Sequence, residues 1–395
     1  MANIMEQNKF TWPLINDNIT QHDKEVLADF ILKSNRFTNG PKVKEFEKAW
    51  SDWLGVKYSV MVNSGASANY ISIAIAKELR GQGSVAVPPL GWASDVSSVV
   101  NLGMDVVWVD AKQSNFSLDE EWLEKTVWTE DFKAIVLVHG LGFNGISDKI
   151  IETAKKYNLI LIEDCCESHG ATYKGKKIGT FGDMSLFSFY YGHHMTTIEG
   201  GMICTNNEEI YELARMYRSH GMTREASKAT QEKYASQFLN PLFTFAVPGF
   251  NMRSTELNAV LGLEQLPRLD YNIKRRQENF KVWLDNLDSK LYFTEYDVEG
   301  NSNFALPLIV NNHDRELLKK ACNVLDEEKV EYRLGTIGGG SQAQQPYMEK
   351  FVKRGTNRWP THTSNYIHSY GLYIGNHTEL TAEQIINLCK RLNNV

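Results

Sequence analysis

Short apolar runs alternate with amphipathic stretches over the first two thirds of this chain. The apolar runs predict strands at 57–62, 84–87, 104–109, 134–138 and 159–162. Helical periodicity predicts helices at 66–80, 94–102 and 149–157. Because strands and helices alternate, we expect an α/β fold with right-handed crossovers and a mainly parallel sheet. Ligands in such sheets bind at the carboxyl ends of the strands.

The last third of the chain has a different pattern. Helices are predicted at 253–266, from about 271 onward, at 314–325 and at 382–392, and strands at 303–310 and 329–334. We therefore expect a large domain at 1–272, which includes an N-terminal arm, and a smaller α+β domain at 273–395. The stretch at 335–345 is rich in glycine and glutamine and predicts a mobile loop that is able to close over a substrate.

The composition is that of an ordinary globular protein. The chain has 395 residues, of which 42% are hydrophobic and 23% charged, and its formal net charge is -6. This modest charge gives no broad attraction to nucleic acid or to an anionic membrane, so small-molecule chemistry is favoured. Residues 1–9 lack the apolar stretch of a signal peptide, and no later run is long enough to span a bilayer, which predicts a cytoplasmic protein.

The cysteines are scattered along the chain without paired spacing. They are Cys165, Cys166, Cys204, Cys322 and Cys389. Their odd number and their spacing argue against a disulfide framework and against a zinc site. We expect reduced thiols, mostly buried.

Three places carry candidate binding chemistry. Residues 62–69 join a strand to a helix through small residues, where free amides and the helix dipole favour a phosphate, although small residues also begin helices for structural reasons. Asp164 ends a strongly apolar strand, where a carboxylate either holds a heterocyclic nitrogen protonated or serves as a cap or a surface acid. Trp92 offers a flat face to an aromatic cofactor, although an isolated tryptophan is more often part of the core.

Motifs that occur in order along nearly the whole chain give it a family resemblance. They lie at 37–43, 64–67, 163–164, 188–201 and 248–257. Together they resemble the fold-type I pyridoxal-phosphate family that acts on nucleotide sugars, which includes sugar aminotransferases and 3-dehydratases. The resemblance implies an aspartate aminotransferase-like three-layer sandwich with a smaller C-terminal domain.

The resemblance also implies which residues contact the cofactor. They are Gly65, Ala66 and Ser188 at its phosphate, Trp92 on the face of its ring, Asp164 at the pyridine nitrogen, Glu167 beside the phenolic oxygen, and Asn251 at the phosphate of the neighbouring subunit. A homodimer with shared active sites is therefore expected. Ala66 stands where related enzymes often have threonine or serine, and Ile198 where aminotransferases usually have glycine, so the cofactor is expected to be held less firmly.

His193 stands where the motif of this family carries lysine. The lysine both bonds covalently to the cofactor and moves a proton. Histidine has no primary amine for the covalent bond, but with an ordinary pKa of about 6.5 it still serves as a base near neutral pH. The replacement therefore predicts a dehydratase rather than an aminotransferase.

With histidine at this place, the chain resembles the branch of 3-dehydratases that act on GDP-linked 4-keto-6-deoxy sugars. The resemblance implies that glutamate converts pyridoxal 5'-phosphate to pyridoxamine 5'-phosphate, and that His193 then removes a proton from the cofactor's methylene carbon while the C3 hydroxyl leaves. The products would be ammonia and a 3-deoxy-4-keto sugar, of the kind used in capsule or lipopolysaccharide biosynthesis. The choice of GDP as the nucleotide rests on this resemblance alone. The motifs are equally compatible with a hexose and a heptose as the sugar.

Three further histidine and arginine positions belong to this prediction. His220 is a candidate acid for the departing hydroxyl and Arg224 a candidate substrate contact, although both also suit an ordinary helix end. His194 is expected to point away from His193, as neighbours do in extended backbone.

Other functions remain open at this stage. They are a nucleotide-sugar aminotransferase with a lysine from elsewhere, a non-catalytic nucleotide-sugar-binding protein, and a metal-dependent lyase. The presence of Asp164, Ser188 and Asn251 weighs against a protein that lost its catalytic activity during evolution. No HxH or HExxH spacing supports a metal site. A related branch uses an iron–sulfur cluster, which needs about four cysteines within reach of one another, so the scattered cysteines predict no cluster and no reductase.

Overall fold

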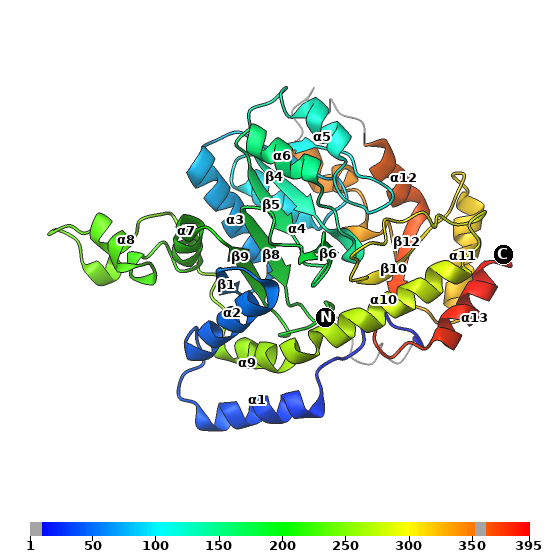
Figure 1. Cartoon of the computed structure of the whole chain (residues 1–395), viewed down its shortest axis with the longest axis horizontal. Coiled ribbons are helices and arrows are strands. Elements are labelled where there is room, and N and C mark those ends of the chain that lie inside the picture. Colours follow the sequence, from blue (N-terminus) through cyan, green and yellow to red (C-terminus); the bar gives the residue numbers. More distant parts are fainter. Residues whose placement is uncertain (1–9, 352–360) are drawn as a thin grey trace.

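A seven-stranded sheet lies at the centre of the N-terminal part of the chain (Figure 1). In the computed structural model, which describes residues 10–351 and 361–395, the strand order is β1-β9-β8-β5-β4-β2-β3. The strands are β1 (Tyr58–Val62), β2 (Ser84–Val87), β3 (Asp105–Trp108), β4 (Phe132–Val138), β5 (Ile160–Asp164), β8 (Met184–Ser188) and β9 (Gly201–Thr205). Strand β9 is antiparallel to both of its neighbours, and the other pairs are parallel. The predicted mainly parallel sheet is confirmed.

Helices cover both faces of this sheet, which gives the three layers expected of the fold. They are α2 (Pro41–Leu54), α3 (Gly65–Arg80), α4 (Ala93–Asn101), α5 (Glu120–Thr126), α6 (Asp148–Lys156), α7 (Glu208–Arg218) and α9 (Glu256–Gln265). One buried core joins α3, α4 and α7 to one face, and another joins α2, α6 and α9 to the opposite face. Successive residues of a strand enter different cores, as Val60 and Met61 do, because side chains alternate across a sheet. Strands buried on both faces explain the continuous apolar runs.

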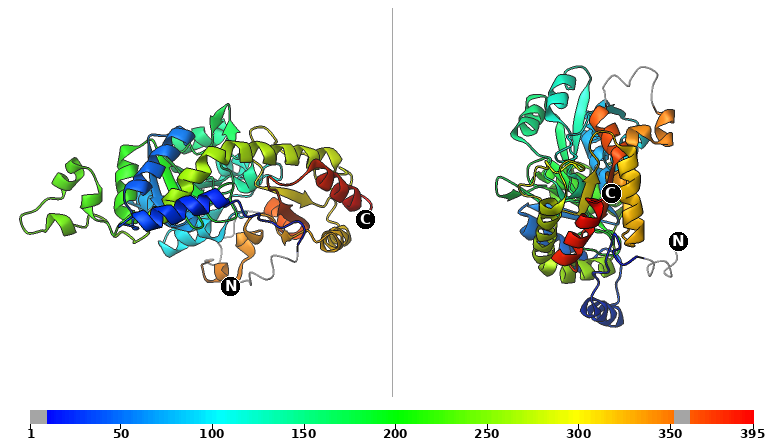
Figure 2. Two further views of the ribbon diagram at one scale, coloured as in Figure 1. Left: turned by 90° about the horizontal axis from the view of Figure 1, so that it is seen from below. Right: turned by 90° about the vertical axis from the view of Figure 1, so that its right-hand side faces the viewer.

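A second, antiparallel sheet forms the C-terminal part. Its order is β10 (Ala305–Ile309), β12 (Gly371–Gly375) and β11 (Tyr332–Leu334). Its helices are α11 (Arg315–Glu327), α12 (His362–Tyr370) and α13 (Ala382–Leu392). The long helix α10 (Leu269–Asn286) runs from the large sheet to the small one (Figure 2). The domain boundary predicted at 272/273 falls inside α10 and stays a prediction.

The remaining elements are short or peripheral. Helix α1 (Gln21–Lys33) lies against α9, and β6 (Thr172–Tyr173) pairs with β7 (Lys176–Lys177). Single 3-10 turns occur at Gly140–Gly142, Leu266–Arg268, Ile337–Gly339, Gln342–Gln344 and Pro346–Lys350. Residues 1–9, part of the predicted N-terminal arm, lie outside the described residues.

The segment between α7 and α9 projects away from the body of the molecule (Figures 1 and 2). It contains a 3-10 turn at Thr223–Glu225, helix α8 (Lys228–Lys233) and a second turn at Pro241–Phe243. Large apolar side chains of this segment are exposed, among them Phe238 (85%), Leu242 and Phe245. A cluster of exposed apolar side chains is typical of a surface that contacts a partner.

The stretch at 335–345 was expected to be a mobile loop, and this prediction is wrong. Its residues Ile337, Ser341 and Gln342 are buried. The amide of Gln342 donates to Pro89 O at 2.8 Å, and its side-chain nitrogen donates to Gly91 O at 3.0 Å. The stretch is therefore a packed connection that supports the segment before α4.

No helix in the described part of the chain combines the length and the apolar character needed to cross a membrane.

Candidate functional site

The N-terminus of α3 is built to receive an anion. The Ser64 Oγ accepts the amide of Ser67 at 3.1 Å and caps the helix, while the amides of Gly65 and Ala66 have no preceding turn to bond. A Cβ on Gly65 would lie 2.8 Å from the Cβ of Ser188, so only glycine allows this approach. Ser188 ends β8, and its hydroxyl thus lies beside the helix terminus. The predicted phosphate residues Gly65, Ala66 and Ser188 come together.

Asp164 is the last residue of β5, which pairs with β8. Its side chain is buried, and its oxygens accept the Cys166 amide at 2.9 Å and the Asn69 side-chain nitrogen at 3.2 Å. It is therefore neither a helix cap nor a surface acid. The carboxyl ends of the neighbouring parallel strands place this acid and the phosphate residues on one edge of the sheet.

Trp92 is not part of the core, because its side chain is 62% exposed. It is the N-cap residue of α4, and its amide donates to Asp95 Oδ2 at 2.9 Å. The backbone is thus fixed while the indole stays uncovered within this chain. Such a ring is available to stack on a ligand.

His193 is half-buried and has a lowered pKa. Burial lowers its pKa to about 4, the charge of Asp164 acts in the opposite direction, and that of Arg276 lowers it further. Its Nδ1 is buried and has no hydrogen-bond partner among the described residues. The imidazole is therefore neutral at pH 7 and has a nitrogen free for a ligand or a proton.

His194 has a separate, structural partner. Its Nε2 lies 3.0 Å from Ser302 O, and the side chain is buried. The expectation of extended backbone here is wrong, because residues 191–195 form turns and bends. Both imidazoles pack against Phe304, so the two histidines differ by their polar contacts rather than by facing opposite ways.

Glu167 lies near Asp164, and its pKa is raised. Burial raises the pKa of Glu167 to about 7, an amide hydrogen bond from Leu141 lowers it, and the charge of Asp164 raises it. The Leu141 amide lies 2.8 Å from Glu167 Oε2, and Leu141 itself has a φ of 52°. Glu167 can therefore exchange a proton near neutral pH at the position predicted for the phenolic oxygen.

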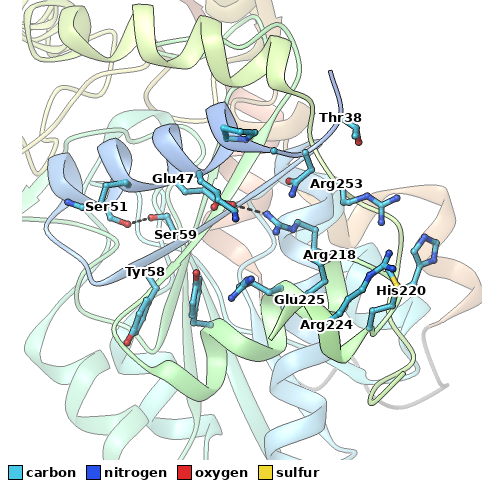
Figure 3. Close-up of a pocket in the computed structure, with 18 of the residues that line it drawn as sticks. Thr38, Glu47, Ser51, Tyr58, Ser59, Arg218, His220, Arg224, Glu225 and Arg253 are labelled. Atoms are coloured by element: carbon cyan, nitrogen blue, oxygen red, sulfur yellow. Dashed lines mark hydrogen bonds and ion pairs between the residues drawn. The ribbon is translucent and has the colours of Figure 1, made fainter. Parts of the chain in front are cut away.

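His220 and Arg224 lie in a different place. They line a cavity of about 1400 Å³ together with Arg253, and neither His193 nor Asp164 lines it (Figure 3). His220 directly follows Ser219, the C-cap residue of α7, and Arg224 lies in the 3-10 turn Thr223–Glu225, so both positions also suit helix-end cations. The Arg224 guanidinium lies 5.6 Å from the centre of the Phe243 ring and donates to Leu242 O at 3.3 Å.

This cavity is strongly basic. Its basic lining residues are Arg36, Lys44, Lys48, Lys57, Arg215, Arg218, Arg224 and Arg253, against the acids Glu47 and Glu225. Asn251 is exposed and is paired in a bridge with Ser219, while Met252, the next residue, accepts the amide of Asn63 at 3.1 Å, directly before the Ser64–Gly65 loop. His220 and Arg224 line the basic cavity, which none of Gly65, Asp164 and His193 lines.

A buried group of His139, Glu163 and Cys165 is the one cluster of possible metal ligands within the described ranges. The Glu163 carboxylate accepts the amides of Gly179, Phe181 and Gly182 at 2.7 to 2.8 Å and faces His139 Nε2 at 3.2 Å. These contacts occupy its oxygens, so the group is a structural network. It does not include His193 or His194, which the metal-dependent alternative requires.

The residues at the sheet edge fit pyridoxal phosphate. An anion fits the amides of α3 beside Ser188, a ring fits the uncovered face of Trp92, and a protonated ring nitrogen fits the buried Asp164. The partnerless Nδ1 of His193 completes the set. Asp95, Arg276 and Phe304 surround these groups, but none of them belongs to a motif that the sequence analysis identified. Arg253, which lines the basic cavity, lies within the motif at 248–257 and could have been found from it.

Comparisons with known proteins find relatives over nearly the whole chain. The model of the DegT/DnrJ/EryC1/StrS aminotransferase family matches residues 18–393. The chain is 34% identical over 399 residues to GDP-4-keto-6-deoxy-D-mannose 3-dehydratase of Yersinia pseudotuberculosis. This alignment covers 97% of the present chain and 98% of that protein. Among solved structures it is similar to a GDP-4-keto-6-deoxymannose-3-dehydratase with a trapped PLP-glutamate geminal diamine, with a TM-score of 0.89, 30% identity and coverage of 97% and 100%. A variant of such an enzyme with bound GDP-perosamine gives a TM-score of 0.88 at 30% identity, with the same coverage.

Proposed function

The chain belongs to the DegT/DnrJ/EryC1/StrS aminotransferase family, and we propose that it is a pyridoxal-phosphate-dependent 3-dehydratase of a GDP-linked 4-keto-6-deoxy sugar. Glutamate supplies the amino group and is oxidised to 2-oxoglutarate, and the other products are ammonia and a 3-deoxy-4-keto sugar. The observation that carries the proposal is the half-buried His193 near Asp164, whose Nδ1 has no partner among the described residues. The similar proteins that bear the dehydratase name, one with PLP-glutamate and one with GDP-perosamine, support it.

The chain's residues would hold the cofactor at three points. Gly65, Ala66 and Ser188 would bind its phosphate, Trp92 would cover its ring, and Asp164 would keep the ring nitrogen protonated. When bound, the cofactor supplies a conjugated ring that takes up the electron pair released from the carbon next to its amino nitrogen.

His193 moves the proton in this reaction. A base must be unprotonated before the step, and burial lowers the pKa of His193 to about 4, so the imidazole is neutral at pH 7. It would accept the proton of the cofactor's methylene carbon as the C3 hydroxyl departs. Glu167, whose pKa is about 7 because of burial, would give or take a proton beside the phenolic oxygen.

The working unit that we propose is a homodimer with shared sites. Within one chain, His220 and Arg224 line a basic cavity that His193 does not line and that suits the diphosphate of a nucleotide sugar. The exposed apolar segment between α7 and α9 supports contact with a second copy. In the dimer, Asn251 would reach the phosphate of the partner's cofactor, Arg224 the substrate, and His220 the departing hydroxyl.

The alternatives have weaker support. An aminotransferase needs a lysine at the cofactor. The charged groups that act on His193 in the described chain are Asp164 and Arg276, and neither is a lysine. We expect no iron–sulfur cluster and no reductase partner, because Cys165, Cys166 and Cys204 belong to the central sheet region while Cys322 and Cys389 lie on α11 and α13. A cytoplasmic location stays part of the proposal, since nucleotide sugars and glutamate are metabolites of that compartment.

The test is incubation of the purified protein with pyridoxal phosphate, glutamate and a panel of GDP-, CDP- and UDP-linked 4-keto-6-deoxy sugars. The expected product lacks one oxygen relative to the substrate and forms from a GDP-linked member, together with ammonia. The His193→Asn variant is the control and should give none. A product that retains nitrogen would identify an aminotransferase and overturn the proposal, and so would the absence of any product across the panel.

A further inference from the structure

Asp95, on the first turn of α4, connects the two residues that would hold the ring of the cofactor. Its Oδ2 accepts the amide of Trp92 at 2.9 Å. The same carboxyl group lies beside the Asp164 carboxylate and the Asn69 side-chain amide. Asp95 is 1% exposed and Asp164 is 5% exposed, so this contact between two acids takes place away from water.

Two buried carboxyl groups form a hydrogen bond only if one of them carries a proton. Asp164 already accepts hydrogen bonds from the Cys166 amide and the Asn69 side chain, and its open side faces the proposed ring site. The Oδ1 of Asp95 is buried and has no hydrogen-bond partner within the described chain. The nearby Asn69 side-chain nitrogen donates to Asp164 Oδ2 and to Ser94 Oγ, each at 3.2 Å. The Oδ1 of Asp95 is the oxygen left to carry the proton.

We propose that Asp95 is a positioning residue that, as a neutral acid, donates a hydrogen bond from Oδ1 to Asp164 while Oδ2 holds the Trp92 turn. One side chain then orients both the ring face and the partner of the ring nitrogen, and Asp164 keeps the negative charge that a protonated ring nitrogen requires. The positioning role rests on the proposed function, whereas the protonation of Asp95 depends only on the fold.

The surroundings of Asp95 favour its neutral form. Burial, followed by the charge of Asp164, raises the pKa of Asp95 well above its ordinary value. The other titratable neighbours are Cys166, after β5, and Tyr347, in the turn at Pro346–Lys350; burial raises the pKa of the Cys166 thiol and raises that of Tyr347 to about 12. Both are uncharged at pH 7, so Asp164 is the charge that Asp95 meets, and His193 lies beyond it.

A competing account is that Asp95 is ionised and only completes the capping box of α4 with the Trp92 amide. The two accounts predict different pH dependences. If Asp95 is neutral in the folded protein and ionised in the unfolded chain, folding takes up one proton. The unfolding equilibrium constant then rises with pH.

The test compares full-length wild type, Asp95→Asn and Asp95→Ala by urea unfolding between pH 5 and pH 8, with and without pyridoxal phosphate. Asparagine imitates the neutral acid, because its amide donates to Asp164. Relative to Asp95→Asn, the unfolding equilibrium constant of wild type without the cofactor should rise with pH, by up to about tenfold for each pH unit. Asp95→Ala should be less stable at every pH and should bind pyridoxal phosphate about tenfold or more weakly, while Asp95→Asn keeps the wild-type affinity within about threefold.

Asp148→Asn is the matched control, because Asp148 is also a first-turn aspartate but pairs with Lys174 at the surface. Its stability relative to wild type should not change between pH 5 and pH 8. If the ratio of the unfolding equilibrium constants of wild type and Asp95→Asn does not change with pH, Asp95 is ionised and the proposal is overturned. An unchanged cofactor affinity in Asp95→Ala would also overturn it. If wild type binds no pyridoxal phosphate, the proposed function and the positioning role fail. The protonation state of Asp95 is then decided by how the stability of wild type relative to Asp95→Asn changes with pH.

Discussion

Phe304 packs its ring against the imidazole of His193, with the centroids 5.6 Å apart and the planes inclined at 44°. The backbone of Phe304 is fixed on both sides, because its amide donates to Leu141 O at 2.9 Å and its carbonyl accepts from Arg276 Nη1 at 2.7 Å. Phe304 directly precedes β10 of the small sheet. The C-terminal part of the chain therefore orients the proposed base of the large sheet.

Removal of this ring should slow the reaction while the cofactor still binds. In Phe304→Ala the imidazole of His193 gains freedom, and we expect kcat to fall about tenfold or more, since small misplacements of a reacting group are costly. The affinity for pyridoxal phosphate, measured by absorbance titration, should change little. Phe280→Ala is the control: it truncates a buried aromatic of the same core and should cost about 3 kcal/mol of stability, yet keep kcat. Equal loss of kcat in both variants would contradict a positioning effect.

His193→Lys should restore a covalent bond to the cofactor. We expect borohydride reduction to fix pyridoxal phosphate to the protein, detected as an increase in intact mass, and dehydration to be lost. His193→Asn should show neither the mass increase nor dehydration, with a rate loss of about 100-fold or more, as is typical when a general base is removed. Dehydration that persists in His193→Lys would refute the role of His193.

Shared active sites predict that two inactive variants complement each other. His193→Asn and Asn251→Ala should each be inactive or nearly so as homodimers. Mixed by unfolding and refolding, they should form heterodimers with one intact site, and random pairing would restore about a quarter of the wild-type activity. Activity that stays at the sum of the two separate variants would show that His193 and Asn251 act within one chain.

Glu167 should make the cofactor-free protein less stable as the pH rises through its titration range. Burial raises the pKa of Glu167 from 4.5 to about 7, so the folded protein holds a proton that the unfolded chain has lost. The stability of wild type relative to Glu167→Gln should thus fall by about 3 kcal/mol between pH 4.5 and pH 7. Urea unfolding at several pH values measures this slope, and Glu121→Gln, at an exposed acid that pairs with Lys149, is the control. A slope of the opposite sign would mean that Glu167 is ionised in the folded protein.

Ile198 stands in a conformation that favours glycine. Its φ is 71° and its side chain is 48% exposed, so strain is not offset by burial. A branched residue in this region costs about 1 to 2 kcal/mol, and Ile198→Gly should raise the free energy of unfolding by about 1 kcal/mol after the added chain entropy of glycine. Ile198→Ala keeps a Cβ and should gain less. A loss of stability in Ile198→Gly would show that the side chain has a packing role.

Much of the fold was predictable because it is encoded locally. The helix expected at 66–80 begins at Gly65, and the strand expected at 159–162 extends to Asp164, since apolar periodicity and capping residues act over a few positions. The common site of Asp164 and Ser188 was implied by the family resemblance, whereas strand β8, which ends at Ser188, was not predicted from the sequence. The stretch at 335–345 was misjudged because its burial depends on contacts with Pro89 and Gly91, which are distant in the sequence.

The sequence by itself determined the family, the layered α/β architecture and the replacement of lysine by His193, since these are written in ordered motifs and local patterns. Only the tertiary structure decided that Asp95 lies beside Asp164, that Phe304 packs on His193, and that His220 and Arg224 line a basic cavity which His193 and Asp164 do not line. Contacts of this kind join segments far apart in the chain. They are fixed by packing, burial and the satisfaction of polar groups, and no local pattern records them.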